Sequence, residues 1–318
     1  MNLRSNLPHI EEIKQAHLRI KPFIHRTPVF TSQSINAITS AFLYFKCENF
    51  QKVGAFKYRG ATNAVLLLPE KQRFKGVATH SSGNHAAALA LAARRLNIPA
   101  YIVMPENSPE VKKKAVAGYG GIITHCEPTL QARERTLEKV IAETGATFIH
   151  PYNRKEIIQG QATAALEFLE QIPEPDMLIA PVGGGGLLSG TAITAKNIAP
   201  ATLVFGAEPK GADDARKSFY KGEIVPSVNP ETIADGLLTS LGSLTFQAIS
   251  ACADDIFTVS EPGIILAMRL IWERMKIVVE PSAAVGLAVV LEYPEQFTNK
   301  KVGIILSGGN VDLKTLPF

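Results

Sequence analysis

The sequence has few charged residues and few cysteines. Charged residues make up 19% of the 318, and the formal net charge of +4 is spread without a basic block, so a nucleic-acid-binding surface is not indicated. Cys47, Cys126 and Cys252 are odd in number and far apart. This pattern favours a reducing compartment, and we expect a cytoplasmic protein rather than a disulfide-bonded secreted one. The seven histidines form no His-Glu-x-x-His motif and no Cys/His cluster, which argues against a zinc site.

Long hydrophobic runs are also missing. No apolar stretch is long enough to span a bilayer, and residues 1–11 lack the apolar core of a signal peptide. We therefore expect no membrane partner. Apolar residues still make up 46% of the chain, which is ordinary for a soluble enzyme, and the length allows two domains.

Apolar strand-like segments alternate with helical patterns along the chain. This alternation predicts an α/β fold with parallel sheets covered by helices. The stretch 222–232, rich in proline and asparagine, is predicted to be a surface loop. Strands are expected at 41–47, 76–80, 100–104, 122–126, 147–150, 177–180, 203–207, 257–259 and 302–306. Helices are expected at 11–23, 57–68, 84–96, 109–118, 131–143, 160–171, 191–198, 263–275 and 282–291.

A run of four glycines, Gly183 to Gly186, follows a predicted buried strand and precedes a predicted helix. Glycine backbone tolerates close approach and unusual dihedral angles, and a helix N-terminus attracts anions, so this turn is a candidate phosphate site. The Gly-Lys-Ser/Thr ending of a P-loop is absent. A dinucleotide site remains an alternative, because Glu208 lies at the distance expected of its acidic residue, although no third glycine falls in place. A flexible turn without a ligand is the third interpretation.

Other turns rich in glycine or serine lie where predicted strands end. In open α/β sheets, ligands bind beyond the carboxyl ends of the strands. Convergence of these turns predicts one cofactor site that suits a flat ring with a phosphate tail. The turns are 81–85, 183–186, 235–236 and 307–310.

Lys57 lies in the sequence Gly-Ala-Phe-Lys-Tyr-Arg-Gly at a predicted helix start. Most lysines are solvated surface groups. Burial among small and aromatic residues would lower the pKa of this amine and free it to attack a carbonyl. An amine of this kind beside a phosphate site suggests a Schiff base with pyridoxal phosphate.

At this point the sequence resembles the serine racemase and serine/threonine dehydratase group of pyridoxal-phosphate enzymes, which have the tryptophan-synthase-β-like fold (fold type II). The resemblance covers almost the whole chain. It implies a large cofactor domain formed by residues 1–73 and 151–318, and a small domain, residues 74–150, that closes over the substrate. It also implies a homodimer. The segments that carry it are 52–60, 79–85, 181–190, 207–214, 232–236, 280–286 and 306–312.

The resemblance implies a set of cofactor-binding residues. Lys57 would hold the cofactor and later remove the α-proton of the substrate. Phe56 would pack beside the ring, and Asn84 would bond the ring hydroxyl. Ser307 would face the pyridine nitrogen; a hydroxyl there leaves that nitrogen mostly neutral, which we infer favours loss of a β-substituent. The phosphate would lie on Gly183, Gly184, Gly185 and Gly186, with Gly236 near the ring.

Substrate and metal residues follow in the same way. Ser81, Ser82, Asn84 and His85, at a helix start, are placed for the substrate carboxylate. Arg133 matches a second anion-binding arginine of racemase-like members, with a solvated helix face as the alternative. The carboxylates of Glu208 and Asp214 and the carbonyl of Ala212 match the divalent-cation site of the group. Such oxygen ligands suit Mg²⁺ or Ca²⁺, with Mn²⁺ as an alternative; a turn with a helix-capping acid is the plainer interpretation.

Ser82 bears on the choice of reaction. Many threonine dehydratases have alanine at the matching position, whereas racemase-like members have a serine that delivers a proton to the cofactor face opposite the lysine. Hydroxyaspartate dehydratases have serine too, and a hydroxyl here can also simply cap the helix. The resemblance therefore implies dehydration of β-hydroxy amino acids such as L-serine and L-threonine to a 2-oxo acid and ammonia, together with serine racemisation. A dedicated racemase and a 3-hydroxyaspartate ammonia-lyase are alternatives within the group. A nicotinamide oxidoreductase and a catalytically silent binding protein are alternatives outside it.

Overall fold

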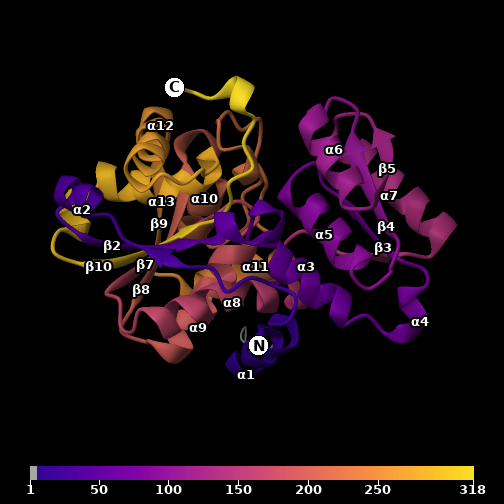
Figure 1. Ribbon diagram of the computed structural model, residues 1–318, viewed down its shortest axis with the longest axis horizontal. Coiled ribbons are helices and arrows are strands. Elements are labelled where there is room, and N and C mark those ends of the chain that lie inside the picture. The colour runs from indigo at the N-terminus through magenta and orange to yellow at the C-terminus, as the bar shows by residue number, and fades with distance from the viewer. Residues whose placement is uncertain (1–5) are drawn as a thin grey trace.

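A computed structural model describes residues 6–318, which form two β-sheets (Figure 1). The six-stranded sheet has the order β1-β2-β10-β7-β8-β9, and all its pairs are parallel except β1 with β2. Its strands are β1 (Val29–Phe30), β2 (Phe42–Cys47), β7 (Met177–Pro181), β8 (Leu203–Pro209), β9 (Asp255–Val259) and β10 (Lys301–Leu306). The four-stranded sheet is parallel throughout, with the order β5-β4-β3-β6. Its strands are β3 (Val77–His80), β4 (Ala100–Pro105), β5 (Gly121–Cys126) and β6 (Thr147–Phe148). The expected α/β class is confirmed.

Helices cover both sheets. In the six-stranded sheet, α13 packs on β7, β8, β9 and β10, and α9 packs on β7 and β8. Figure 1 shows α12 and α13 on one side of this sheet and α8 and α9 on the other. In the four-stranded sheet, α5 and α7 each pack on β3, β4 and β5. The helices are α1 (Ile10–Ile20), α2 (Gln33–Thr39), α3 (Lys57–Leu66), α4 (Glu70–Arg73), α5 (Asn84–Arg94), α6 (Glu110–Gly118), α7 (Leu130–Thr144), α8 (Lys155–Gln171), α9 (Gly186–Ile198), α10 (Asp214–Lys221), α11 (Ser243–Cys252), α12 (Glu261–Leu270), α13 (Pro281–Glu292) and α14 (Pro294–Phe297).

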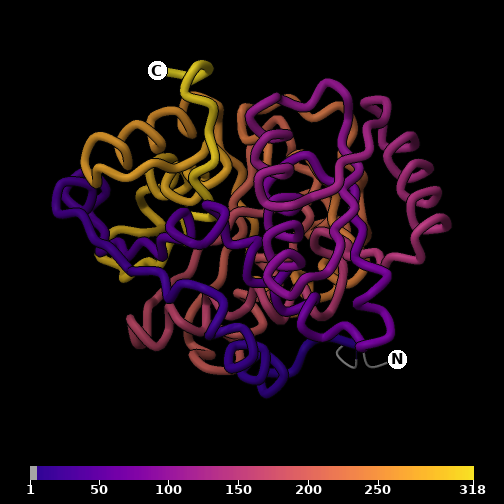
Figure 2. Tube along the Cα trace, turned by 45° about the vertical axis from the view of Figure 1, so that its right-hand side comes forward, coloured from indigo at the N-terminus to yellow at the C-terminus, as the bar shows by residue number. Residues whose placement is uncertain are grey.

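We call residues 77–148, which supply every strand of the four-stranded sheet, the small unit, and the rest of residues 6–318 the large unit. The two units lie side by side in Figures 1 and 2, with the small unit on the right of Figure 1. That they move as domains stays a prediction.

The junction between the units is made by α3. This helix packs on α8 of the large unit and on α5 of the small unit. Glycine permits the close contact with α8, because a Cβ at Gly160 would lie 2.5 Å from the Cα of Gly60. The helix that begins at Lys57 is therefore held from both sides.

A buried ionic network fixes the same helix. Arg59 is fully buried, and its guanidinium lies 2.7 Å from Glu48 Oε2 and 2.7 Å from Glu167 Oε2. Lys46 Nζ donates to the same Glu167 oxygen at 2.9 Å. Buried charges are tolerated only when they are paired and hydrogen-bonded, and these four balance one another.

Several helix limits differ from the sequence prediction. The predicted start of α9 at 191 is wrong, because the helix begins within the glycine run at Gly186. Close packing outweighs the poor helix propensity of glycine here: a Cβ at Gly190 would lie 2.7 Å from the backbone nitrogen of Ala162. Helix α8 begins at Lys155, earlier than predicted, and α2, α10 and α11 were not predicted. Residues 223–234 contain no helix or strand, as expected of a surface loop.

No helix within residues 6–318 has both the length and the apolar composition needed to cross a bilayer.

Candidate active site

The predicted strand-end turns come together where the two units meet. The backbone N–H of Phe56 donates to the carbonyl of Ser307 at 3.0 Å, which joins the start of α3 to the turn after β10. A Cβ at Gly183 would lie 3.2 Å from the carbonyl oxygen of Gly236, so the glycine loop contacts the turn 235–237. Asn84, after β3, bonds to Asn310, after β10. One site is thus lined by segments that are far apart in sequence.

Lys57, the first residue of α3, carries the amine of this site. Its Nζ donates to the carbonyl of Pro151 at 3.0 Å. The rings of Phe56 and Tyr152 enclose it, with centroids 5.2 and 5.9 Å from the nitrogen. Burial lowers the pKa of the Lys57 amine to about 8, against a smaller opposing effect of the Glu280 carboxylate. The lowered pKa raises the share of free amine near neutral pH, and only the free amine attacks a carbonyl.

The glycine loop opens α9 and leaves backbone donors available. Ser189 has the first N–H in α9 that bonds a backbone carbonyl, that of Gly185 at 2.8 Å. The N–H groups of Gly186, Leu187 and Leu188 precede it and can bind an anion, supported by the helix dipole.

Packing explains why the loop needs glycine. A Cβ at Gly184 would lie 2.3 Å from the ring of Tyr152, and one at Gly183 would lie 2.9 Å from the Cα of Leu237. Gly185 has φ +85°, which favours glycine. A Cβ at Gly186 would meet Tyr152 Cβ at 3.1 Å. The glycines therefore allow the loop to pack closely against Tyr152 and Leu237, and they also leave room for a ligand.

The turn after β3 leads into α5. Ser81 and Ser82 are half-buried in it, and the N–H of Gly83 makes a long 3.4 Å contact with Ser81 Oγ. His85 is buried, and its Nε2–H donates to the Ile149 carbonyl at 3.2 Å. Burial, together with the positive charge of Lys57, lowers the pKa of His85 to about 3, so the ring is neutral. Its remaining Nδ1 is then an acceptor, and any contribution of His85 to carboxylate binding falls to its backbone N–H.

Sequence reasoning missed the segment after β6. Tyr152 covers Gly184, and His150 accepts the backbone N–H groups of Tyr152 and Asn153 through Nδ1, at 3.3 and 3.0 Å. The rings of His150 and Tyr152 meet edge to face, 4.6 Å apart. Burial lowers the pKa of His150 to about 4. Their position in the sequence could have identified these residues, because Pro151 and Tyr152 follow the end of a parallel strand.

Arg133 lies on α7, in the small unit. Its Nε is buried and has no hydrogen-bond partner among the described residues. Burial lowers the pKa of His80; the Glu134 carboxylate opposes this shift and the positive charge of Arg133 adds to it, so both side chains lie near the end of β3. A buried guanidinium nitrogen without a partner is suited to a negatively charged group.

The predicted cation ligands lie together, in β8 and in the segment that follows it. Glu208 is buried and accepts the N–H groups of Arg216 and Ala215 at 2.7 and 3.3 Å, so it caps α10. Asp214 Oδ2 is buried without a partner among the described residues. Burial raises the pKa of Glu208 to about 9 and that of Asp214 to about 6, and neighbouring carboxylates add to both shifts. A cavity of about 260 Å³ adjoins Ala212 and Asp214.

This set of two carboxylates and a carbonyl fits a hard cation such as Mg²⁺ or Ca²⁺, because their oxygens are the ligands that such ions prefer. Residues 6–318 contain no group of three or more His, Cys, Asp or Glu side chains arranged to hold a metal. Water would therefore have to complete the coordination shell.

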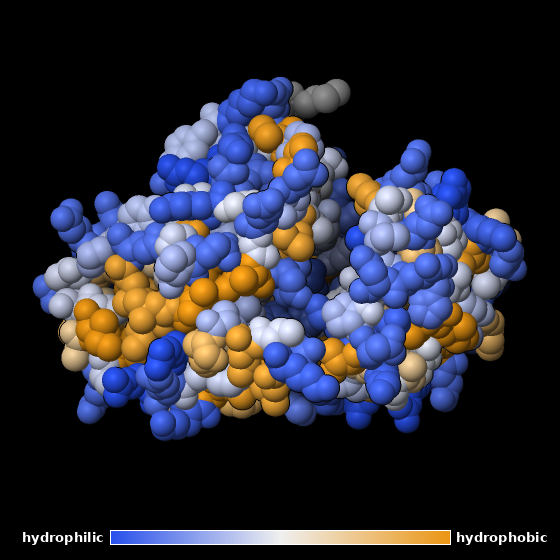
Figure 3. Space-filling model, turned by 90° about the horizontal axis from the view of Figure 1, so that it is seen from above, coloured by the Kyte–Doolittle hydropathy of each residue, from blue (hydrophilic) through white to orange (hydrophobic). Residues whose placement is uncertain are grey.

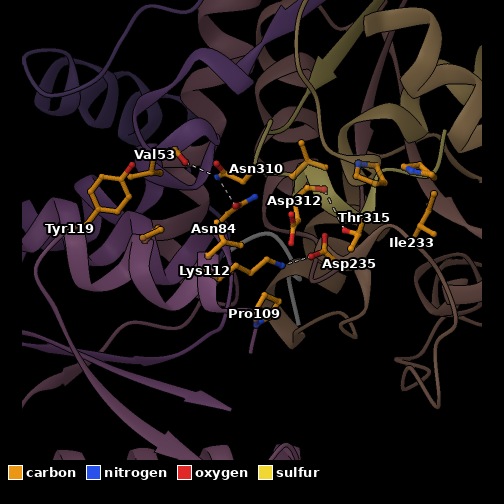
Figure 4. A pocket seen from close by; sticks show the side chains of 17 residues that line it. Val53, Asn84, Pro109, Lys112, Tyr119, Ile233, Asp235, Asn310, Asp312 and Thr315 are labelled. Carbon is orange, nitrogen blue, oxygen red and sulfur yellow. Dashed lines mark hydrogen bonds and ion pairs between the residues drawn. The ribbon is translucent and has the colours of Figure 1, made fainter. Parts of the chain in front are cut away.

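A cavity of about 460 Å³ lies in the cleft between the units, beside Asn84. In Figure 4, Lys112 from the small unit reaches toward Asp235 of the large unit, and Asn84 faces Asn310. Lys112 and Asp235 form an ion pair across the cleft. Figure 3 shows the surface hollowed between the two masses.

The family described as pyridoxal-phosphate dependent enzyme matches residues 20–308. The chain belongs to this family. The beta-hydroxyaspartate dehydratase of Paracoccus denitrificans (strain Pd 1222) is 52% identical over 312 residues, covering 98% of this chain and 99% of that protein. The crystal structure of serine racemase from Dictyostelium discoideum matches with a TM-score of 0.92 at 51% identity, covering 96% and 99%. The crystal structure of a T.th. threonine deaminase matches with a TM-score of 0.92 at 41% identity, again covering 96% and 99%. The interpretation of the glycine turn as a dinucleotide site is thereby excluded.

The residues at this site fit pyridoxal phosphate. Lys57 would supply the amine for the cofactor aldehyde, and the start of α9 would supply N–H donors for the phosphate. Ser307 is 3% exposed at the end of β10, where it can face a ring nitrogen. When bound, this cofactor stabilises negative charge that develops on the substrate α-carbon.

Proposed function

We propose that this enzyme eliminates water from β-hydroxy amino acids such as L-serine and L-threonine, giving a 2-oxo acid and ammonia, and also racemises serine. The observation that carries the proposal is the Lys57 amine, held between two rings at the junction of the units. Its pKa, lowered by burial to about 8, suits it to both amine and base chemistry. Relatives named for racemisation, dehydration and deamination support the same chemistry.

Lys57 and Ser82 take complementary roles in this proposal. Lys57 removes the proton from the substrate α-carbon. Ser82, in the turn that leads into α5, returns a proton from the opposite face, which inverts the centre. The backbone N–H groups at the start of α5, among them that of His85, bind the substrate carboxylate beside Ser81. The β-hydroxyl leaves when elimination outpaces reprotonation.

The small unit closes over the substrate and excludes water. Lys112 and Asp235, paired across the cleft, would hold it shut. Glu208, Asp214 and the Ala212 carbonyl bind Mg²⁺ or a similar ion in a structural or activating role, remote from the chemistry.

We also propose a cytoplasmic homodimer. The rings of Phe30 and Phe50 are exposed by 39% and 43% and lie 6.1 Å apart. Figure 3 shows hydrophobic side chains gathered over the large unit, as expected of a surface that another copy covers. Cys47 and Cys126 are buried thiols, consistent with a reducing compartment.

One observation favours a second substrate class, the 3-hydroxyaspartates. The unpaired Nε of Arg133, which lies near His80, could bind the second carboxylate of such a substrate. Arg133→Ala should then raise the KM for 3-hydroxyaspartate while leaving that for L-serine nearly unchanged. An equal effect on both substrates would instead assign Arg133 to the fold.

The deciding experiment is product analysis with purified protein, pyridoxal phosphate and Mg²⁺. Pyruvate and D-serine are measured in one sample from L-serine, with L-threonine and 3-hydroxyaspartate in parallel. D-serine in amounts comparable to pyruvate supports both activities, and Ser82→Ala should then remove D-serine and spare pyruvate. Pyruvate alone would make the protein a dehydratase and reduce Ser82 to a binding hydroxyl. No product from any substrate would overturn the proposed function in favour of a silent binding protein.

A further inference from the structure

The side-chain amide of Asn84 is held by partners from the opposite side of the cleft. Its Nδ2 donates to both carboxylate oxygens of Glu280, at 2.9 and 3.1 Å. Its Oδ1 accepts from Asn310 Nδ2 at 2.8 Å. Asn84 begins α5 of the small unit, whereas Glu280 precedes α13 and Asn310 follows β10 in the large unit. Figure 4 shows Asn84 and Asn310 facing each other beside the cavity.

The hydrogen bonds determine which way the Asn84 amide points. Asn310 Nδ2 also donates to the backbone carbonyl of Val53 at 2.7 Å, and a carbonyl can only accept. The nitrogen of Asn310 therefore faces Val53 and Asn84, so Asn84 must present its oxygen there. The Asn84 nitrogen then faces Glu280, whose carboxylate can only accept when ionised. A flipped amide would break these contacts.

Two glycines make room for this arrangement. A Cβ at Gly308 would lie 2.7 Å from Glu280 Oε1, and a Cβ at Gly54 would lie 2.7 Å from Asn310 Oδ1. Gly54 also has φ +71°, a conformation that other residues rarely adopt. The backbone at Gly308 and Gly54 can therefore approach Glu280 and Asn310, the two partners of Asn84, without a clash.

Burial of the Glu280 carboxylate costs free energy, which suggests that the residue is kept for a function. It is 4% exposed, and burial raises its pKa to about 7, although the bond from Asn84 acts in the opposite direction. Within the described residues, no lysine or arginine forms an ion pair with it. Its charged neighbours are Asp235 and Lys112, while its carboxylate opposes the lowering of the Lys57 pKa. An ionisable group kept in such a place is a common mark of a functional site.

We propose that Glu280 is the positioning residue that orients Asn84 toward the cofactor, with Asn310 fixing the other end of the amide. This inference rests on the proposed function, in which Asn84 donates to the ring hydroxyl of pyridoxal phosphate. The Glu280 carboxylate accepts one Asn84 N–H, shared between its two oxygens, which leaves the second N–H to donate to the ring hydroxyl and keep it ionised. Because the three residues come from both units, the amide is fixed only when the small unit is docked on the large one.

A double-mutant cycle on the holoenzyme tests this inference. The variants are Glu280→Gln, Asn84→Ala and the two combined. The first readout is the ratio of the long-wavelength to the short-wavelength absorption band of the bound cofactor, which reports ionisation of the ring hydroxyl. The second is the dissociation constant of the cofactor. We expect Glu280→Gln to shift the ratio toward the protonated form and to weaken cofactor binding about tenfold, or 1.4 kcal/mol. In the Asn84→Ala background it should change neither readout, because coupled residues are non-additive.

Three further results decide the matter. Asn310→Ala should reproduce the shift and be equally non-additive with Asn84→Ala. Glu273→Gln, which removes an exposed carboxylate paired with Arg269, should leave both readouts unchanged. The melting temperature of the cofactor-free Glu280→Gln protein should stay close to that of the wild type, which separates positioning from folding. Equal effects of Glu280→Gln in both backgrounds, or no effect in either, would overturn the proposal. Failure of the wild type to form a visible band that Lys57→Ala abolishes would overturn the proposed function instead.

Discussion

Lys57 Nζ lies 3.0 Å from the carbonyl oxygen of Pro151, so the amine that opens α3 is tied to the chain leaving β6. Tyr152, the next residue, covers both this amine and the glycine loop. The contact therefore links the small unit, at the point where the chain returns from it, to the cofactor site. A displacement of that segment would therefore change the position and the surroundings of the Lys57 amine.

The first prediction concerns the pH dependence of cofactor capture. Only the unprotonated Lys57 amine attacks the aldehyde, and burial lowers its pKa to about 8. The rate of holoenzyme formation from cofactor-free protein should therefore rise with pH, reach half its maximum near pH 8 and level off above. Stopped-flow absorbance measures it, with Nα-acetyl-lysine as the control, whose rate should keep rising to its ordinary pKa. A protein profile that coincides with that of the control would contradict the assignment.

The second prediction concerns Gly184. A methyl group there would overlap the Tyr152 ring, so Gly184→Ala should displace the ring or the loop and weaken cofactor retention at least tenfold. The measurement is the cofactor content after dialysis. Gly118→Ala is the matched control, because a Cβ at Gly118 in α6 meets nothing within 4 Å. Alanine there should leave cofactor content unchanged. Full retention in Gly184→Ala would show that the loop tolerates the side chain.

The outcome at Gly184 shows what could be read from the sequence and what could not. The strand-end turns were predictable, because the carboxyl ends of parallel strands lie along one edge and their glycine- and serine-rich turns are visible in the chain. The reason for glycine was only partly predictable, since Tyr152 meets Gly184 through a tertiary contact. Glu280 and Asn310 were missed as site residues for the same reason.

Helix limits were harder to predict than strand positions. Helix α9 begins inside the glycine run, where local propensity predicts a loop and packing against α8 decides otherwise. Helix α10 begins at Asp214, and Glu208 from β8 caps its first N–H groups. Because the capping residue belongs to another element, the sequence of the helix does not indicate where the helix begins.

The third prediction concerns stability. Arg59→Ala would leave Glu48 and Glu167 buried with one positive partner fewer, so we expect a loss of about 3–5 kcal/mol in the free energy of unfolding. Arg26→Ala, which breaks an exposed pair with Glu170, is the matched control and should cost at most about 1 kcal/mol. Urea denaturation of both variants gives the comparison. Similar losses of unfolding free energy in the two variants would mean that the buried network contributes little to stability.

The fourth prediction concerns the cation site. Lys217 lines the cavity beside Asp214, and its Nζ lies 2.6 Å from Asp213 Oδ1. Lys217→Gln removes a positive charge that competes with the ion, so Mg²⁺ affinity measured by calorimetry should rise by about 2- to 10-fold at low salt. Lys221→Gln is the control, because Lys221 ends the same helix and pairs instead with Glu223. An equal rise in both would indicate a general charge effect, whereas Glu208→Gln should abolish binding if the site is correctly assigned.

The last prediction concerns closure of the cleft. Lys112 of α6 and Asp235 form an ion pair between the units, with side chains that are 31% and 49% exposed. A half-exposed pair contributes roughly 0–1 kcal/mol, so Lys112→Ala should lower kcat/KM by about 2- to 5-fold and do so less at high salt. Lys113→Ala is the control, since Lys113 pairs with Glu110 within the same helix and makes no bond across the cleft.

The pair of Lys112 and Asp235 acts on closure and not on the chemistry, so the ratio of D-serine to pyruvate should stay constant while the overall rate falls. A changed product ratio in Lys112→Ala would mean that the pair reaches the reacting groups, and no loss of rate would remove it from the closing mechanism.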